Sequence, residues 1–148
     1  RNVMAELSHS VLVDYDLAPA LRWYAEGLTK RTGVAVAVKE QGQARRLALH
    51  AEEELFRIAQ EALANVTKHA RAREVILTMA FTPRDICLTI ADDGCGFDST
   101  QSREPARGNG WGLMIMRERA ATAGGQFKVE SAPGRGTRVS VTLRSDAS

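Results

Sequence analysis

The chain has 148 residues, with 20 Lys and Arg against 18 Asp and Glu, which gives a formal net charge of +2. Hydrophobic residues make up 44% and charged residues 26%, the proportions of an ordinary globular domain, so we expect neither disorder nor a membrane span. A charge this close to zero gives no support for nucleic-acid binding. Two cysteines in a domain of this size argue against a disulfide framework and favour a reducing, cytoplasmic setting.

The first half of the chain predicts a helix, a strand and a longer helix. Apolar residues recur at helical spacing over 18–32, and valines alternate with alanines over 34–38, as in a short strand. Residues 51–70 give the clearest helical pattern, because apolar positions keep the three-and-four spacing and glutamates crowd the first turn.

The second half predicts two strand pairs with a helix between them. Runs at 74–81 and 85–91 are joined by a tight connection and should pair as a hairpin. Residues 111–123 predict a helix that ends at two glycines, and the last strands span 126–131 and 137–143. Helices and hairpins in this order predict a two-layer α/β sandwich. A doubly wound dinucleotide fold would need stricter alternation and a G-x-G-x-x-G motif after the first strand.

Four polar residues of the longer helix could act together. Glu61 and Asn65 lie four residues apart and so share one face, and Lys68 and His69 continue near it. The set offers one oxygen ligand for Mg²⁺, one possible base and two phosphate contacts. Taken alone, these residues also fit the solvent-facing side of an amphipathic helix. The glycine-rich segments elsewhere favour the ligand-binding interpretation.

A carboxylate and two glycines follow the strand at 85–91. Asp92 can accept a hydrogen bond from the exocyclic amine of adenine, and this selects against guanine because the guanine 6-oxo group is itself an acceptor. Gly94 and Gly96 would let the chain pass close to the ring. An ordinary Asp-Gly turn is the alternative interpretation.

A second glycine cluster precedes the helix at 111–123. Gly108, Gly110 and Gly112 lie where the free amides and the dipole of a helix start favour an anion, so phosphates are the natural ligand. A flexible hinge is the alternative. Residues 97–109 predict a mobile loop, since they are rich in small polar residues and flanked by glycines.

One more pair of glycines lies between the last two strands. We interpret Gly134 and Gly136 as parts of a simple hairpin turn. Thr137, directly after them, could place its hydroxyl near a bound base.

The four motifs, taken in order, resemble the N, G1, G2 and final glycine boxes of the GHKL ATPase superfamily. They read Glu61-x-x-x-Asn65-x-x-Lys68-His69, Asp92-x-Gly94-x-Gly96, Gly108-x-Gly110-x-Gly112-Leu113 and Gly134-x-Gly136-Thr137. Segments 56–63 and 112–119 are typical of the ATP-binding catalytic domain of sensor histidine kinases of the nitrate/nitrite-sensor subfamily. The resemblance covers residues 16–143 and implies a GHKL (Bergerat) sandwich, a mixed and mostly antiparallel sheet covered by three helices on one face.

The same resemblance implies roles for individual residues. Asn65 would ligate Mg²⁺, and Lys68 and His69 would approach the phosphates of ATP. Asp92 would bind the adenine amine, and Thr137 would support it through water.

Further roles follow around the phosphates. Glu61 matches the general base of the hydrolysing relatives, and residues 108–113 would wrap the triphosphate beneath an ATP lid at 97–110. Trp111 is larger than the usual residue between these glycines, and it either stacks against lid or base or merely packs. The catalytic candidates are Glu61, Asn65 and Lys68. The nucleotide-binding candidates are Asn65, Lys68, His69, Asp92, Gly94, Gly96, Gly108, Gly110, Trp111, Gly112, Leu113 and Thr137.

The resemblance implies the ATP-binding catalytic domain of a two-component sensor histidine kinase. Such a domain binds Mg-ATP and donates the γ-phosphate to a histidine on a dimerisation domain, for onward transfer to a response regulator. We expect residues 1–15 to be a linker from that upstream domain, 16–144 to be the catalytic domain and 145–148 a tail. His9 lacks the acidic neighbour of a phosphoacceptor, so we expect the accepting histidine to lie outside this chain.

The expected partners are ATP, the protein's own dimerisation and phosphoacceptor domain, and a response regulator. We expect no nucleic-acid or membrane contact, a monomeric isolated domain, and a place on the cytoplasmic side of a membrane-anchored sensor. An anti-sigma factor serine kinase that sequesters a partner protein is the main alternative. A non-enzymatic domain whose lid responds to nucleotide is another.

Overall fold

The computed structural model describes residues 16–97 and 109–144, with the backbone alone at 69–70 and 109–111. Its elements in chain order are α2 (Leu17–Thr32), β1 (Ala35–Gln41), α3 (Leu49–Asn65), the π-helical turn η1 (Val66–Ala70), β2 (Glu74–Phe81), β3 (Asp85–Asp92), α4 (Asn109–Thr122), β4 (Gln126–Ser131) and β5 (Thr137–Arg144). These elements confirm the helices and strands that the sequence predicts, apart from the end of the longer helix. Most of the expected loop at 97–109 lies outside the described residues.

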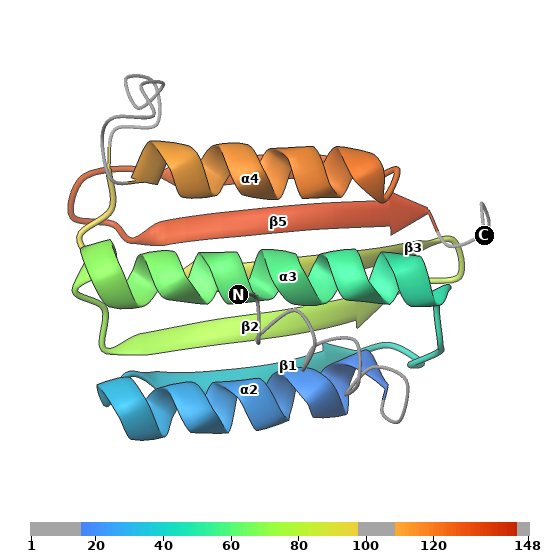
Figure 1. Ribbon diagram of the computed structural model, residues 1–148, viewed down its shortest axis with the longest axis horizontal. Coiled ribbons are helices and arrows are strands. Elements are labelled where there is room, and N and C mark those ends of the chain that lie inside the picture. Colours follow the sequence, from blue (N-terminus) through green and yellow to red (C-terminus); the bar gives the residue numbers. More distant parts are fainter. Residues whose placement is uncertain (1–15, 98–108, 145–148) are drawn as a thin grey trace, which may run out of the picture.

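The strands form one five-stranded sheet in the order β1-β2-β3-β5-β4. β1 runs parallel to β2, and the remaining pairs are antiparallel, including the predicted hairpins β2-β3 and β4-β5. Figure 1 shows α2, α3 and α4 side by side on one face of this sheet. The predicted two-layer α/β sandwich, with a mixed sheet and three helices on one face, is therefore confirmed.

Alternation along the strands decides which face the helices cover. In β2 the side chains of Val75, Leu77 and Met79 are buried while their neighbours are more exposed, as the two-residue period of a strand requires. α3 lies over the middle of the sheet and is buried along one stripe at helical spacing. Its buried apolar side chains are Leu55, Phe56, Ile58, Ala59, Ala62 and Leu63.

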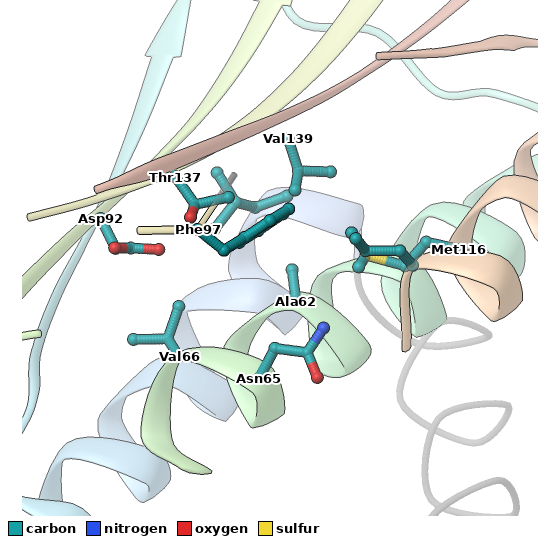
Figure 2. A pocket seen from close by; sticks show the side chains of 10 residues that line it. Ala62, Asn65, Val66, Asp92, Phe97, Met116, Thr137 and Val139 are labelled. Atoms are coloured by element: carbon teal, nitrogen blue, oxygen red, sulfur yellow. The ribbon is translucent and has the colours of Figure 1, made fainter. Parts of the chain in front are cut away.

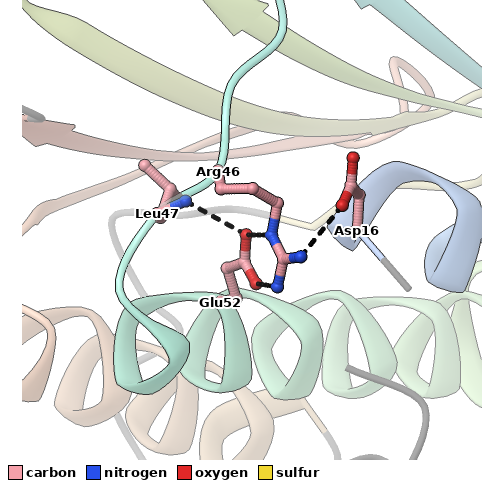
Figure 3. A network of polar contacts seen from close by, with 4 residues as sticks. All are labelled: Asp16, Arg46, Leu47 and Glu52. Carbon is pink, nitrogen blue, oxygen red and sulfur yellow. Dashed lines mark hydrogen bonds and ion pairs between the residues drawn. The ribbon is translucent and has the colours of Figure 1, made fainter. Parts of the chain in front are cut away.

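A buried carboxylate fixes the first turn of α3. The Glu52 side chain is 1% exposed, and its two oxygens accept hydrogen bonds from Arg46 Nε at 3.1 Å and Arg46 Nη2 at 3.0 Å. The backbone N–H of Leu47 donates to the same carboxylate at 3.1 Å. Arg46 Nη1 also pairs with Asp16 Oδ1 at 3.1 Å, as Figure 3 shows. The loop before α3 is thereby tied to both the helix and the start of α2.

The other end of α3 departs from the prediction. We expected one α-helix over 51–70, but the chain widens into the π-helical turn η1 after Asn65. The turn ends at Arg71, which has φ 54° and ψ 35°, a left-handed conformation that is uncommon outside glycine, Asn and Asp. Because a π-turn holds more residues than an α-turn, the predicted helical face does not continue to Lys68 and His69.

No helix in the described ranges 16–97 and 109–144 is long and apolar enough to cross a bilayer.

Candidate functional site

A cavity of about 30 Å³ lies between the helices and the sheet, at the end of α3 that carries η1. Its walls come from α3, β3, α4, β5 and the segment after β3. The lining residues are Ala62, Asn65, Val66, Ile90, Asp92, Phe97, Leu113, Met116, Thr137 and Val139. The lining is mostly apolar, with a few polar groups that a ligand could meet, as in most small-molecule sites.

Four residues predicted as site residues meet at this cavity. Asn65 comes from the end of α3, Asp92 from the end of β3 and Thr137 from the start of β5. Leu113, in the first turns of α4, completes the set. Asp92 and Thr137 are register partners on adjacent strands, and Figure 2 shows them across from Asn65. Segments far apart in the sequence are thus brought to one place.

Asp92 is a partly buried carboxylate at the polar end of the cavity. Burial raises the pKa of its carboxyl, and the charge of Asp93 adds to that rise. The backbone N–H groups of Gly94 and Thr137 act against it, and Gly94 N donates to Asp92 Oδ1 at 2.8 Å. The hydrogen bonds fix the carboxylate in place, which suits an acceptor for a ligand amine.

The neighbouring Asp93 has a structural task instead. Its Oδ1 accepts hydrogen bonds from the backbone N–H of Arg73 at 2.9 Å and of Glu74 at 3.1 Å. These donors hold the pKa of the Asp93 carboxyl below its usual value, with the N–H of Glu74 contributing most. The Asp93 carboxylate thus binds the start of β2, whereas the adjacent Asp92 carboxylate faces the cavity.

Two glycines fit the loop after β3 against the turn between β4 and β5. Gly96 has φ 65°, and a Cβ there would overlap the carbonyl oxygen of Ala132. Gly136 has φ 74°, and a Cβ there would overlap the carbonyl oxygen of Asp92. Gly136 lies in the turn of the β4-β5 hairpin, as interpreted, and close packing on the Asp92 backbone is a second reason for glycine there. Gly134, at φ 78°, fits that interpretation, since a Cβ there would meet nothing within 4 Å.

A third glycine brings α4 against the end of α3. A Cβ on Gly112 would lie 2.5 Å from Asn65 Nδ2 and 2.7 Å from Asn65 Oδ1. α4 begins at Asn109, so Gly110 and Gly112 belong to its first turn and do not precede it as predicted. The N–H groups of that first turn have no partner within the helix, as an anion site requires.

The remaining predicted residues are placed less centrally. Glu61 is partly exposed on α3 and Lys68 is exposed in η1, and neither lines the cavity. Gly94 is buried and donates to Asp92. Only the backbone is described for His69, Gly110 and Trp111, and Gly108, like most of the expected lid, lies outside the described residues.

The sequence interpretation placed Phe97 only at the start of the expected lid, not among the binding residues, and it missed Ser131. Phe97 follows the last glycine of its motif and lines the cavity. Ser131 ends β4, where its hydroxyl accepts a hydrogen bond from Phe97 N at 2.9 Å and lies 2.8 Å from Thr137 Oγ1. A signal was present, because alternation along β4 puts Ser131 on the same side as Phe127 and Val129, which pack against the core.

Comparison with known proteins agrees with this geometry. The family model described as "Histidine kinase-, DNA gyrase B-, and HSP90-like ATPase" matches residues 50–147. The chain is 33% identical over 143 residues to the signal transduction histidine-protein kinase/phosphatase DegS of Brevibacillus brevis, covering 97% of this chain and 36% of that protein. It is 35% identical over 132 residues to the nitrate/nitrite sensor protein NarX of Escherichia coli, covering 89% of this chain and 21% of that protein.

A solved structure shows the same fold. The histidine kinase domain of the blue-light activated histidine kinase EL346 from Erythrobacter litoralis aligns with a TM-score of 0.67 at 19% identity, covering 88% of this chain and 62% of that one. The chain spans about a third of the length of DegS and about a fifth of the length of NarX.

Proposed function

Because the chain belongs to the family of histidine kinase-, DNA gyrase B- and HSP90-like ATPases, we propose that it is the ATP-binding catalytic domain of a two-component sensor histidine kinase. One observation carries the proposal: the end of α3, the end of β3, the start of α4 and the start of β5 converge on one cavity. Each of these segments contributes a residue from one of the four family motifs.

Asp92 would recognise the base. Its carboxylate accepts a hydrogen bond from the 6-amino group of adenine, whereas the 6-oxo group of guanine would set two acceptors against each other. The apolar lining, including Val139 and Met116, would offer the ring an apolar surface to pack against. We therefore propose ATP as the preferred nucleotide.

The other end of the cavity would hold the phosphates and Mg²⁺. The Asn65 carboxamide oxygen is a ligand type that Mg²⁺ accepts, and one protein ligand together with substrate phosphates is its common arrangement. When bound, the ion would neutralise charge on the triphosphate. The free N–H groups of the first turn of α4, near Gly110 and Gly112, would face the phosphates. Lys68 and His69 would approach the phosphates as well.

The reaction transfers the γ-phosphoryl group to an imidazole nitrogen of the dimerisation domain. The bond from the γ-phosphorus to the bridging oxygen breaks, a phosphorus–nitrogen bond forms, and ADP leaves. A neutral imidazole is already nucleophilic, so the catalytic domain contributes mainly positioning and charge neutralisation. Glu61 matches a base of hydrolysing relatives, and here it would at most orient the incoming imidazole.

The domain organisation follows from this proposal. Residues 16–144 would form the catalytic domain, 1–15 the linker from the dimerisation domain and 145–148 a tail. The phosphoryl group would pass to a response regulator. The full-length protein would be a membrane-anchored sensor with this domain, monomeric in isolation, on the cytoplasmic side.

Calorimetric titration of this chain with Mg-ATP tests the nucleotide site. We expect Asp92→Ala to weaken ATP binding by about 1–3 kcal/mol, because the ligand amine loses its buried acceptor. Asp93→Ala is the matched control, since that adjacent carboxylate joins Arg73 and Glu74 and does not line the cavity. Unchanged affinity in Asp92→Ala, with a folded protein, would contradict the assignment.

Labelled ATP added to the full-length protein tests the chemistry. We expect an acid-labile, base-stable label on a histidine of the dimerisation domain, and loss of that label in Asn65→Ala. A phosphoserine on an added partner protein would instead favour an anti-sigma factor serine kinase.

A further inference from the structure

The hydroxyl of Ser131 joins three separate backbone segments next to the cavity. It accepts a hydrogen bond from Phe97 N at 2.9 Å, donates to the carbonyl oxygen of Gly136 at 3.1 Å and lies 2.8 Å from Thr137 Oγ1. Two of these partners, Phe97 and Thr137, line the cavity, whereas Ser131 itself does not. Any effect of Ser131 on a ligand in this cavity therefore passes through those two residues.

Counting donors fixes the direction of the Thr137 hydroxyl. A serine hydroxyl has one hydrogen and two lone pairs. Ser131 gives its hydrogen to the Gly136 carbonyl, which can only accept, and one lone pair already takes the N–H of Phe97. The short contact with Thr137 is then satisfied only if Thr137 donates its own hydrogen to Ser131.

This direction decides what Thr137 can offer a ligand. With its hydrogen turned toward Ser131, the Thr137 oxygen has only lone pairs left for the cavity, so it acts there as an acceptor. Asp92, its register partner on β3, is an acceptor as well, and Figure 2 shows both at the same end of the cavity. Two adjacent acceptors favour a ligand group with two hydrogens to donate, such as an amine, over a carbonyl oxygen, which can only accept.

We propose that Ser131 is a specificity-determining positioning residue, which holds the Thr137 hydroxyl as an acceptor and so makes the site discriminate 6-amino from 6-oxo purines. This inference rests on the proposed function and extends it beyond the carboxylate of Asp92. Without Ser131, the Thr137 hydroxyl can rotate and donate, and a 6-oxo group then finds a donor beside Asp92. Removing the Ser131 hydroxyl also removes the acceptor of the Phe97 N–H.

The test compares ATP with inosine triphosphate, which carries a 6-oxo group in place of the amine. We expect Ser131→Ala to reduce the ratio of ATP affinity to inosine triphosphate affinity about five- to tenfold, the worth of one neutral hydrogen bond. Ser131→Thr keeps a hydroxyl and should restore most of the ratio. Ser140→Ala is the matched control, because alternation with buried Val139 and Val141 puts Ser140 on the helix-free face of β5.

A folded Ser131→Ala variant with an unchanged ratio would overturn the proposal, and so would an equal loss of affinity for both nucleotides, which a purely structural role would give. Should Ser131→Ala not fold, Thr137→Val and Ser131→Thr carry the test. Thr137→Val should lower the ratio in the same direction, Ser131→Thr should keep it, and any other pair of results contradicts the inference. Failure of the wild-type chain to bind ATP would instead refute the proposed function.

Discussion

The two ends of helix α3 use polar side chains in opposite ways. At the first turn, the Glu52 carboxylate is buried and its oxygens are occupied by hydrogen bonds from Arg46 and Leu47. At the last turn, Asn65 faces a cavity, and the chain leaves through a π-helical turn that closes on Arg71 in a left-handed conformation. At the first turn, polar groups whose hydrogen bonds are all made stabilise the fold. At the last turn, polar groups face the cavity and can meet a ligand, and the backbone beside them is strained.

This difference between the two ends of α3 predicts that the substitution most harmful to folding lies in the first turn of the helix. Glu52→Ala should lower the free energy of unfolding by about 3 kcal/mol, because it removes a buried carboxylate, leaves the Leu47 N–H without its acceptor and opens a cavity. Urea denaturation measures this loss. ATP affinity of the folded variant should stay at the wild-type value, since Glu52 lies at the far end of α3 from the proposed nucleotide site. A large drop in affinity without a loss of stability would reverse the comparison.

The outer salt bridge of the same network provides a control. Asp16 pairs with Arg46 through a side chain that is 65% exposed, so Asp16→Asn should change stability by less than about 0.5 kcal/mol.

The next effect concerns the turn at the functional end. Gly136→Ala should cost about 2 kcal/mol, because it combines a left-handed conformation with overlap on the Asp92 carbonyl. The displaced Asp92 should also bind ATP less tightly. Gly134→Ala is matched in conformation but meets nothing within 4 Å, so it should cost about 1 kcal/mol and leave binding unchanged. Equal effects from the two variants would show that the turn does not support Asp92.

Most of the fold could be predicted from sequence, and the reason is local. Strands such as β2 alternate between buried and exposed residues, and α3 keeps its apolar spacing, so the pattern of the chain alone specifies the elements and the covered face. The convergence of Asn65, Asp92 and Thr137 could be predicted only through the family motifs, because their spacing along the chain does not reveal which strands are neighbours.

Close packing between distant segments could not be predicted. Gly112 against Asn65 and Gly136 against Asp92 are contacts between elements, and a glycine in a sequence does not say whether a turn, a ligand or another backbone requires it. The same holds for η1, since a π-turn reflects the packing around it more than its own residues. Ser131 is different: it was missed, but it could have been predicted, because alternation along β4 alone shows a hydroxyl at a core-facing position.

A smaller effect follows from the carboxylate of the site. Burial raises the pKa of Asp92, so the folded state holds a proton more tightly than the unfolded state, and stability falls as pH rises from about 3.8 through the raised pKa. Asp92→Asn removes this charge and should be as stable as the wild type in acid and slightly more stable at pH 7, while ATP affinity falls. Thermal unfolding at about pH 3, below the unfolded-state pKa, and at pH 7 measures the difference. A variant less stable at pH 7 would mean that the carboxylate supports folding.

A small effect on folding should accompany a large effect on function. In Gly112→Ala the new methyl must displace the Asn65 side chain and not backbone, and the cost is offset in part by the better helix propensity of alanine. Stability should therefore change by less than about 1 kcal/mol. The displaced carboxamide should lose the proposed Mg²⁺ contact, so ATP binding should respond less to added Mg²⁺ in calorimetry.

Gly27→Ala separates this effect from helix propensity. Gly27 lies in α2, where a Cβ would meet only the end of the Arg31 side chain at 3.2 Å, so the same substitution should stabilise the fold and leave Mg²⁺ dependence unchanged. If Gly112→Ala kept full Mg²⁺ dependence, the position of Asn65 would not matter to the ion. If it lowered the free energy of unfolding as much as Glu52→Ala should, both ends of α3 would serve stability, because glycine at 112 would then be needed for packing alone.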